Sequence, residues 1–76
     1  MLVHISVNKE LRHDTKAMVR LMQEIVDTSG MQGANTERFH KFAVLSGHID
    51  PGRVAEIEAL EHVTAVEPDQ ERFPLQ

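Results

Sequence analysis

The chain has no cysteine, tryptophan or tyrosine among its 76 residues. The absence of cysteine excludes disulfides, thiol nucleophiles and thiolate metal sites. A chain of this length has room for one hydrophobic core, and without disulfides its stability must come from packing or from association. The sequence therefore predicts one small domain without redox or thiolate chemistry.

Positive charge and long apolar runs are also scarce. Twelve acidic against eight basic residues give a formal net charge of -4, and the basic residues form no cluster interleaved with aromatics. Nucleic-acid-binding domains normally show the opposite balance, so we expect no nucleic-acid partner. The chain reaches Lys9 and Glu10 before any apolar run long enough for a signal peptide or a membrane span. These features predict a cytoplasmic protein with no membrane partner.

Alternating apolar residues predict strands at both ends and in the middle of the chain. The segments Leu2 to Val7 and Lys41 to Ile49 both show the period-two pattern of a half-buried strand. His62 to Val66 is a last apolar strand, ended by Pro68, which cannot donate to a ladder. A weaker pattern predicts one further strand from Thr36 to His40.

Two helices are predicted between these strands. Asp14 and Thr15 can cap a first helix that stops at Gly30, a residue suited to the left-handed C-terminal cap. Asp50 and Pro51 start a second, shorter helix, with Asp at the cap and Pro at the first helical position. The residues expected to face inward are Met18, Leu21, Met22, Ile25 and Val26 in the first helix and Val54, Ile57 and Leu60 in the second.

The order strand, long helix, strand, strand, short helix, strand predicts an α+β fold. We expect a ferredoxin-like βαββαβ sandwich, whose four-stranded antiparallel sheet carries two helices on one face. This domain spans residues 1–69, and residues 70–76 form an extended C-terminal tail. By alternation, the bare sheet face carries Leu2, His4, Ser6, Val44, Ser46 and His48. That set is more apolar and less charged than a free surface normally is, so we expect a contact there.

The histidine and serine residues of the bare face suggest two hypotheses, a metal site and a catalytic site. His4 and His48 could face each other across neighbouring strands, but two ligands do not make a zinc site, so we predict no metal and no cofactor. Ser46 and His48 lie two apart on one strand, yet nothing in the sequence orients the imidazole or supplies an oxyanion hole. The lysines lie in polar segments, which disfavours Schiff-base chemistry. We therefore predict a protein that is not an enzyme.

Two carboxylates, Glu67 and Asp69, follow closely at the end of the last strand. Spacing alone favours a solvated turn in which Pro68 ends the strand. Paired carboxylates at a sheet end can also cap helix N-termini of another protein, because those ends present free N–H groups and partial positive charge. The tail 70–76 could then dock as an extended strand in an enzyme groove.

The chain resembles the propeptide inhibitor family of subtilisin-like serine proteases, including its free-standing fungal members. Phe42 to Ile49 looks like the third strand of the family, and Val63 to Asp69 looks like its closing signature, hydrophobic-x-x-Val-Glu-x-Asp. Pro68 stands where an acidic residue is common. In that family the bare sheet packs on two surface helices of the protease, and the Glu and Asp cap those helices. The resemblance implies capping roles for Glu67 and Asp69, sheet contacts for the bare face, and a subtilisin-like serine protease as partner.

The resemblance also implies that the tail lies in the protease active site like a product, and it leaves two registers open. This chain has one residue more after the Asp than its relatives usually have. In one register Leu75 occupies the primary specificity pocket, with Phe73 and Pro74 before it and Gln76 beyond it. In the other, Gln76 occupies the primary pocket and Phe73 the fourth.

The leading hypothesis is an inhibitor or chaperone-like binder of a subtilisin-like protease, and three alternatives stay open beside it. One is a small structural or regulatory module that forms a homodimer through its open sheet. A second alternative comes from the closing segment, Val63 to Asp69, which also resembles that of short bacterial ferredoxin-like proteins, some labelled as aldolases. A ligand-binding module of the amino-acid-sensing kind would carry a Gly-containing turn after the first strand, where this chain has Asn8 to Leu11.

Overall fold

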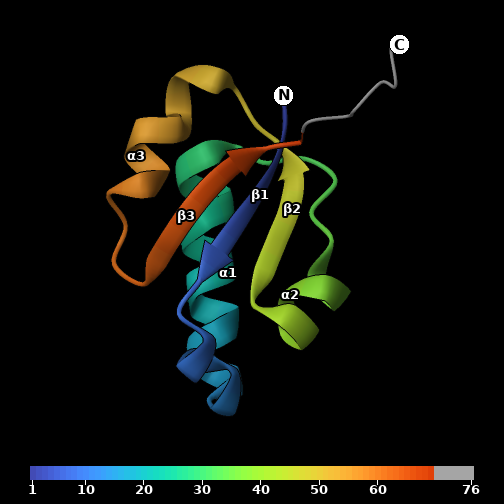
Figure 1. Cartoon of the computed structure of the whole chain (residues 1–76), viewed down its shortest axis with the longest axis vertical. Coiled ribbons are helices and arrows are strands. Elements are labelled where there is room, and N and C mark those ends of the chain that lie inside the picture. The colour runs from blue at the N-terminus through green and yellow to red at the C-terminus, as the bar shows by residue number, and fades with distance from the viewer. Residues whose placement is uncertain (70–76) are drawn as a thin grey trace, which may run out of the picture.

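The computed structural model describes residues 1–69, which form a three-stranded antiparallel sheet and a set of helices (Figure 1). The strands are β1 (Leu2–Val7), β2 (Val44–His48) and β3 (Val63–Pro68), in the sheet order β2-β1-β3. The helices are α1 (Thr15–Ser29), α2 (Thr36–Phe42) and α3 (Val54–Glu58), joined by the short 3-10 helices η1 (Lys9–His13) and η2 (Pro51–Arg53). The predicted α+β class is confirmed.

The predicted strand from Thr36 to His40 is wrong, because this segment lies in helix α2, and the sheet of the described chain has three strands rather than four. The side chain of Asn35 accepts a hydrogen bond from the backbone N–H of Arg38 at 3.1 Å and so caps the helix. Phe39 of α2 is fully buried. One cap and one buried aromatic outweigh a weak period-two pattern.

The segment between α1 and α2 occupies part of the edge where the missing strand was expected. Gln32 and His48 exchange two backbone hydrogen bonds of 2.9 Å each, in antiparallel orientation. The N–H of Asn35 then donates to the carbonyl of Ser46 at 2.9 Å. The outer edge of β2 is therefore partly covered, although no strand forms there within residues 1–69.

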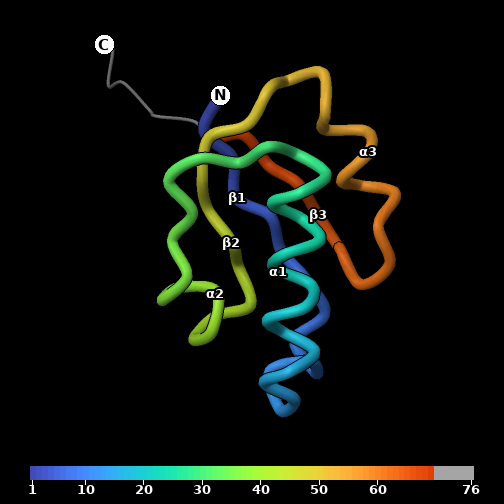
Figure 2. Tube along the Cα trace, turned by 180° about the vertical axis from the view of Figure 1, so that it is seen from behind, coloured from blue at the N-terminus to red at the C-terminus, as the bar shows by residue number. Residues whose placement is uncertain are grey.

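Helix α1 begins and ends where the sequence predicts. The Asp14 carboxylate accepts from the N–H of Ala17 at 3.1 Å, and Gly30 closes the helix in the left-handed conformation at φ 67°. In the view from behind, α1 lies in front of the strands (Figure 2). Its buried residues are Met18, Leu21, Ile25 and Ser29.

The core lies between the sheet and the helices. Val3, Ile5 and Val7 alternate inward from β1, as predicted, and each is at most 2% exposed. Leu45 of β2 and Ile57 of α3 are fully buried with them. One layer of helices thus covers one face of the sheet.

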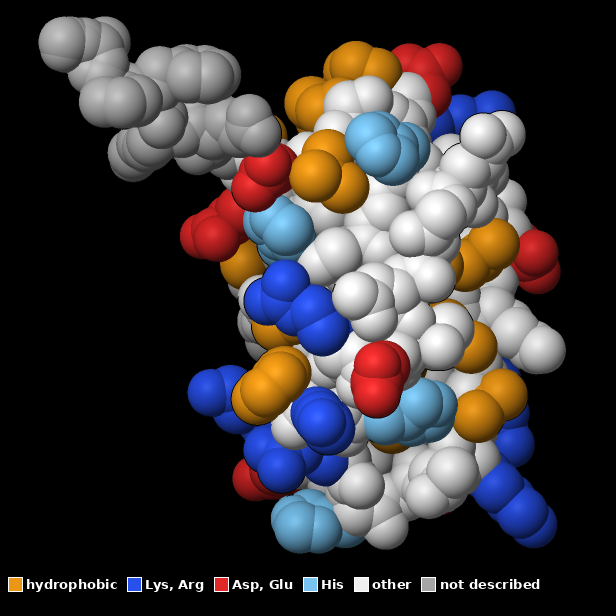
Figure 3. Space-filling model, turned by 90° about the vertical axis from the view of Figure 1, so that its right-hand side faces the viewer, with side chains coloured by type: hydrophobic (Ala, Val, Ile, Leu, Met, Phe, Trp, Pro, Cys, Tyr) orange, Lys and Arg blue, Asp and Glu red, His pale blue; other side chains and the backbone are white. Residues whose placement is uncertain are grey.

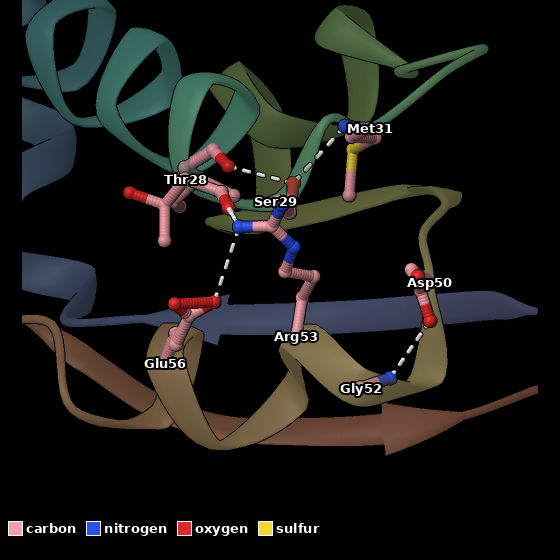
Figure 4. A network of polar contacts seen from close by, with 8 residues as sticks. Thr28, Ser29, Met31, Asp50, Gly52, Arg53 and Glu56 are labelled. Atoms are coloured by element: carbon pink, nitrogen blue, oxygen red, sulfur yellow. Dashed lines mark hydrogen bonds and ion pairs between the residues drawn. The ribbon is translucent and has the colours of Figure 1, made fainter.

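The second predicted helix starts at Asp50 as expected, but it is built from η2 followed by the short helix α3. The Asp50 carboxylate accepts from the N–H of Gly52 at 2.9 Å (Figure 4). The guanidinium of Arg53 then donates to the carbonyl of Thr28 and to the carboxylate of Glu56, both at 3.3 Å. This arginine ties the C-terminal end of α1 to the start of α3.

Candidate functional site

One face of the sheet is not covered by a helix of the described chain. Helix α1 lies behind the three strands in Figure 1 and in front of them in Figure 2. Residues paired across neighbouring strands share a face, so the register assigns the uncovered face directly. This open face consists of Leu2, His4, Ser6, Val44, Ser46, His48, Ala65 and Glu67. The set includes all the residues that the sequence placed there.

The register corrects one predicted juxtaposition. His4 lies opposite Ser46, and His48 lies opposite Leu2, so the two imidazoles are not cross-strand partners. Alternation specifies which face a residue takes, but the position of each strand along its neighbour comes from turns and packing. Within residues 1–69, no three His, Asp or Glu side chains converge in a way that could hold a metal ion.

His4 is the centre of a polar chain that crosses the whole sheet. Its Nδ1 lies 2.7 Å from the Ser46 hydroxyl, and its Nε2 lies 3.0 Å from Oδ1 of Asp69. Ser46 is 8% exposed, and the His4 and Asp69 side chains are 29% and 33% exposed. The three residues come from β2, from β1 and from the position after β3.

Sequence reasoning missed this chain of contacts. It paired Ser46 with His48 along one strand and found nothing to orient the imidazole. The structure pairs Ser46 with His4, and Asp69 orients that ring. The only available signal was the alternation that puts Ser46 and His4 on one face, and alternation does not specify the register.

The two carboxylates at the end of β3 emerge at one corner of the sheet. Glu67 is exposed and lies opposite His4. Asp69 extends the pairing beyond β3, because its N–H donates to the carbonyl of Leu2 at 2.9 Å. The predicted tail contacts, Phe73, Pro74, Leu75 and Gln76, lie outside the described residues.

The Ser46, His4 and Asp69 side chains are of the types used in nucleophilic catalysis, but they lie on an open surface. Three hollows of the described chain lie beside α1 and at the start of β3, and none of these three is lined by Ser46, His4 or Asp69. A nucleophile also needs preorganised donors for the oxyanion. What the contacts show is a hydrogen-bonded chain that joins the three strands on their open side.

Within residues 1–69, most Lys and Arg side chains lie toward one end of the molecule, with a few carboxylates among them (Figure 3). Of the Lys and Arg residues in 1–69, only Arg53 has a carboxylate within ion-pair distance. The other six lie on η1, on the first half of α1 and on α2, and are Lys9, Arg12, Lys16, Arg20, Arg38 and Lys41. Glu67 and Asp69 stand at the other end of the sheet, where β1 begins. The chain is acidic overall but basic at one end.

A scan against protein-family models, a search of curated proteins and a search of solved structures each found no match to this chain. The resemblance to propeptide inhibitors therefore depends on the residues themselves. Among residues 1–69, no helix has the length and apolar content needed to cross a membrane.

Proposed function

We propose that this chain is a non-catalytic binder of a subtilisin-like serine protease, acting as an inhibitor or as a chaperone-like folding helper. The observation that supports this function is one corner of the molecule. There the open face ends in Glu67 and Asp69, and there the chain continues into residues 70–76. A partner on the open face would meet the sheet and the carboxylates together, and residues 70–76 follow Asp69 directly in the sequence.

The carboxylates fit the ends of helices on a partner. A helix N-terminus presents N–H groups without intrahelical acceptors and about half a positive charge, so it favours an anionic acceptor. Glu67 is exposed, and one of the Asp69 oxygens bonds His4. Because an ionised carboxylate accepts through both oxygens, each residue keeps capacity for partner N–H groups.

The composition of the rest of the open face suits packing against the sides of two neighbouring helices of the protease. Leu2, Val44 and Ala65 are half-buried apolar residues, and they surround the polar contact between His4 and Ser46. A non-obligate interface has this mixed composition, since it must stay soluble when unpaired. We assign the sheet contacts to this face, with His48 at its rim.

The strand order also supports the ferredoxin-like sandwich of that family. A ferredoxin-like sheet without its second strand has the order that β2, β1 and β3 adopt here. Residues 31–35 and α2 take the path of the absent strand. The open face and the closing carboxylates are unaffected by this replacement.

Inhibition assays on a panel of subtilisin-like proteases test the proposal. We expect inhibition at micromolar concentration, and we expect deletion of residues 70–76 to abolish it because the tail would occupy the active site. Glu67→Gln and Asp69→Asn should each weaken inhibition by about tenfold, the size of one charge-assisted hydrogen bond. Glu58→Gln, an exposed carboxylate on α3, is the matched control and should change nothing. No inhibition by the full chain, or inhibition unchanged by the deletion, would refute the proposal.

A further inference from the structure

Asp69 is the last described residue, and two separate interactions hold it. Its backbone N–H donates to the carbonyl of Leu2 at 2.9 Å, and its carboxylate bonds Nε2 of His4 at 3.0 Å. The side chain is 33% exposed, so the carboxylate is held while still open to a partner. Residues at the end of a strand normally fray unless such contacts fix them.

The contacts of His4 determine its tautomer. An ionised carboxylate only accepts, so Nε2 must carry the proton and donate to Asp69. In a neutral imidazole Nδ1 is then the acceptor, and the Ser46 hydroxyl must donate to it at 2.7 Å. Ser46 is 8% exposed, so its hydroxyl has little water to compete for the bond. The Ser46 hydroxyl thus holds the orientation of the His4 ring, and the ring holds the Asp69 carboxylate.

We propose that His4 is a positioning residue for the Asp69 carboxylate and that Ser46 orients His4 for this task. This inference rests on the proposed function, in which Asp69 caps a helix of the protease. A free carboxylate would lose rotamer freedom on binding, and a carboxylate already held by His4 loses less. The polar chain also holds Asp69, the residue that precedes residues 70–76 in the sequence.

His4 has a matched control on the same face. His48 is also an imidazole of the open face, but it lies opposite Leu2, and no polar contact of its side chain is found within residues 1–69. His4→Ala and His48→Ala therefore remove the same group from one surface. Only His4→Ala removes the hydrogen bond to the Asp69 carboxylate.

Nuclear magnetic resonance of the labelled chain alone gives a readout that needs no protease. We expect the ring nitrogens of His4 to show a protonated Nε2 and an unprotonated Nδ1. His4→Ala should speed exchange of the Asp69 amide by about tenfold, because local opening governs exchange at such an end. His48→Ala should leave that amide unchanged.

Inhibition gives the second readout. His4→Ala should weaken inhibition by about tenfold. In this variant the Asp69 carboxylate is no longer held by His4, so it must be ordered when the protease binds. Ser46→Ala should weaken it less, since the His4 bond to Asp69 remains. His4→Gln should restore part of the loss, because an amide both donates and accepts. The free energy of unfolding of these three variants, measured in parallel, should not follow the order of their losses of inhibition.

The outcomes separate this inference from the proposed function. If the full chain inhibits no protease, the proposed function fails, while the resonance experiment still decides whether His4 holds Asp69. If neutral His4 carries its proton on Nδ1 instead of Nε2, or if His4→Ala and His48→Ala have equal effects on Asp69 exchange, the positioning role is refuted.

Discussion

At the scale of single residues, the ends of α1 and α2 are set by left-handed backbone positions. Gly30 closes α1 at φ 67°, and Ala43 closes α2 at φ 60°. Glycine adopts this conformation freely, whereas a residue with a Cβ is strained in it. Ala43 is 1% exposed, so its methyl group is held in the core despite that strain. The two caps use the same geometry with different side chains.

Gly30→Ala should lower the free energy of unfolding by about 1 kcal/mol. A Cβ at this position would meet no atom within 4 Å, so the whole effect would come from the positive φ. Gly52→Ala is the control, because its Cβ would make only an ordinary contact, 3.5 Å from the Asp50 carboxylate. Urea unfolding measures both. Equal losses at the two positions would contradict the assignment of α1's end.

At the scale of elements, α2 is the part of the fold that departs from the predicted pattern. Its two phenylalanines differ in environment, since Phe39 is fully buried and Phe42 is 56% exposed. The sequence pattern placed Phe39 in the predicted strand from Thr36 to His40 and Phe42 in the next one, from Lys41 to Ile49. As a helix, the segment inserts one aromatic ring into the core and leaves the other at the surface.

Phe39→Ala should cost about 3 to 5 kcal/mol of folding free energy, because a fully buried ring is removed. Phe42→Ala should change it by less than about 0.5 kcal/mol. Denaturant unfolding gives both values, and Phe39→Leu provides a milder variant should the alanine variant fail to fold. Similar losses for the two alanine variants would argue against helix α2.

The segment before α2 packs closely on β2. A Cβ on Gly47 would lie 2.5 Å from both Cγ and Sδ of Met31 and 3.1 Å from the carbonyl oxygen of Gln32. Met31 is 6% exposed. Glycine in this strand therefore allows the close approach of the segment that replaces the fourth strand.

Gly47→Ala should lower the free energy of unfolding by about 1 to 3 kcal/mol through overpacking. Met31→Ala makes room for the new methyl group, so the double variant should be more stable than the sum of the two single losses predicts, by about 1 kcal/mol. A double-mutant cycle in urea measures this coupling. Strict additivity would show that Met31 does not lie over Gly47.

At the scale of the whole molecule, one sheet face is covered by helices and the other is exposed with a polar centre. His4, Ser46 and Asp69 bond one another across that open face, and Leu2 and Val44 beside them are only half-buried. Obligate dimer interfaces are more apolar than this. A second copy would also have to supply N–H donors to the Asp69 carboxylate, because burying a charge without such partners carries a large desolvation penalty.

We therefore expect the chain to be a monomer at micromolar concentration, with its open face accessible. Sedimentation velocity or light scattering measures the mass in solution. A stable dimer that protects the amides and side chains of the open face would support self-association instead, since that face could not then meet a protease.

Several features could be predicted from local signals in the sequence alone. Alternation in β1 reports which side chains face the core, and the cap residues Asp14 and Gly30 report where α1 starts and stops. Asp50 likewise marks the start of the second helical segment. Each of these signals depends on residues a few positions apart, so it survives without knowledge of the fold.

Other features were decided only by the tertiary structure. The segment from Thr36 is a helix in which Phe39 is fully buried, and the burial of Phe39 in the core is what the local sequence pattern does not reveal. The contact of His4 with Ser46 and Asp69 joins residues 42 and 65 positions apart, through the register of three strands. Register depends on turns and packing across the sheet, so the sequence by itself placed His4 on the open face, and only the folded sheet selected its partners.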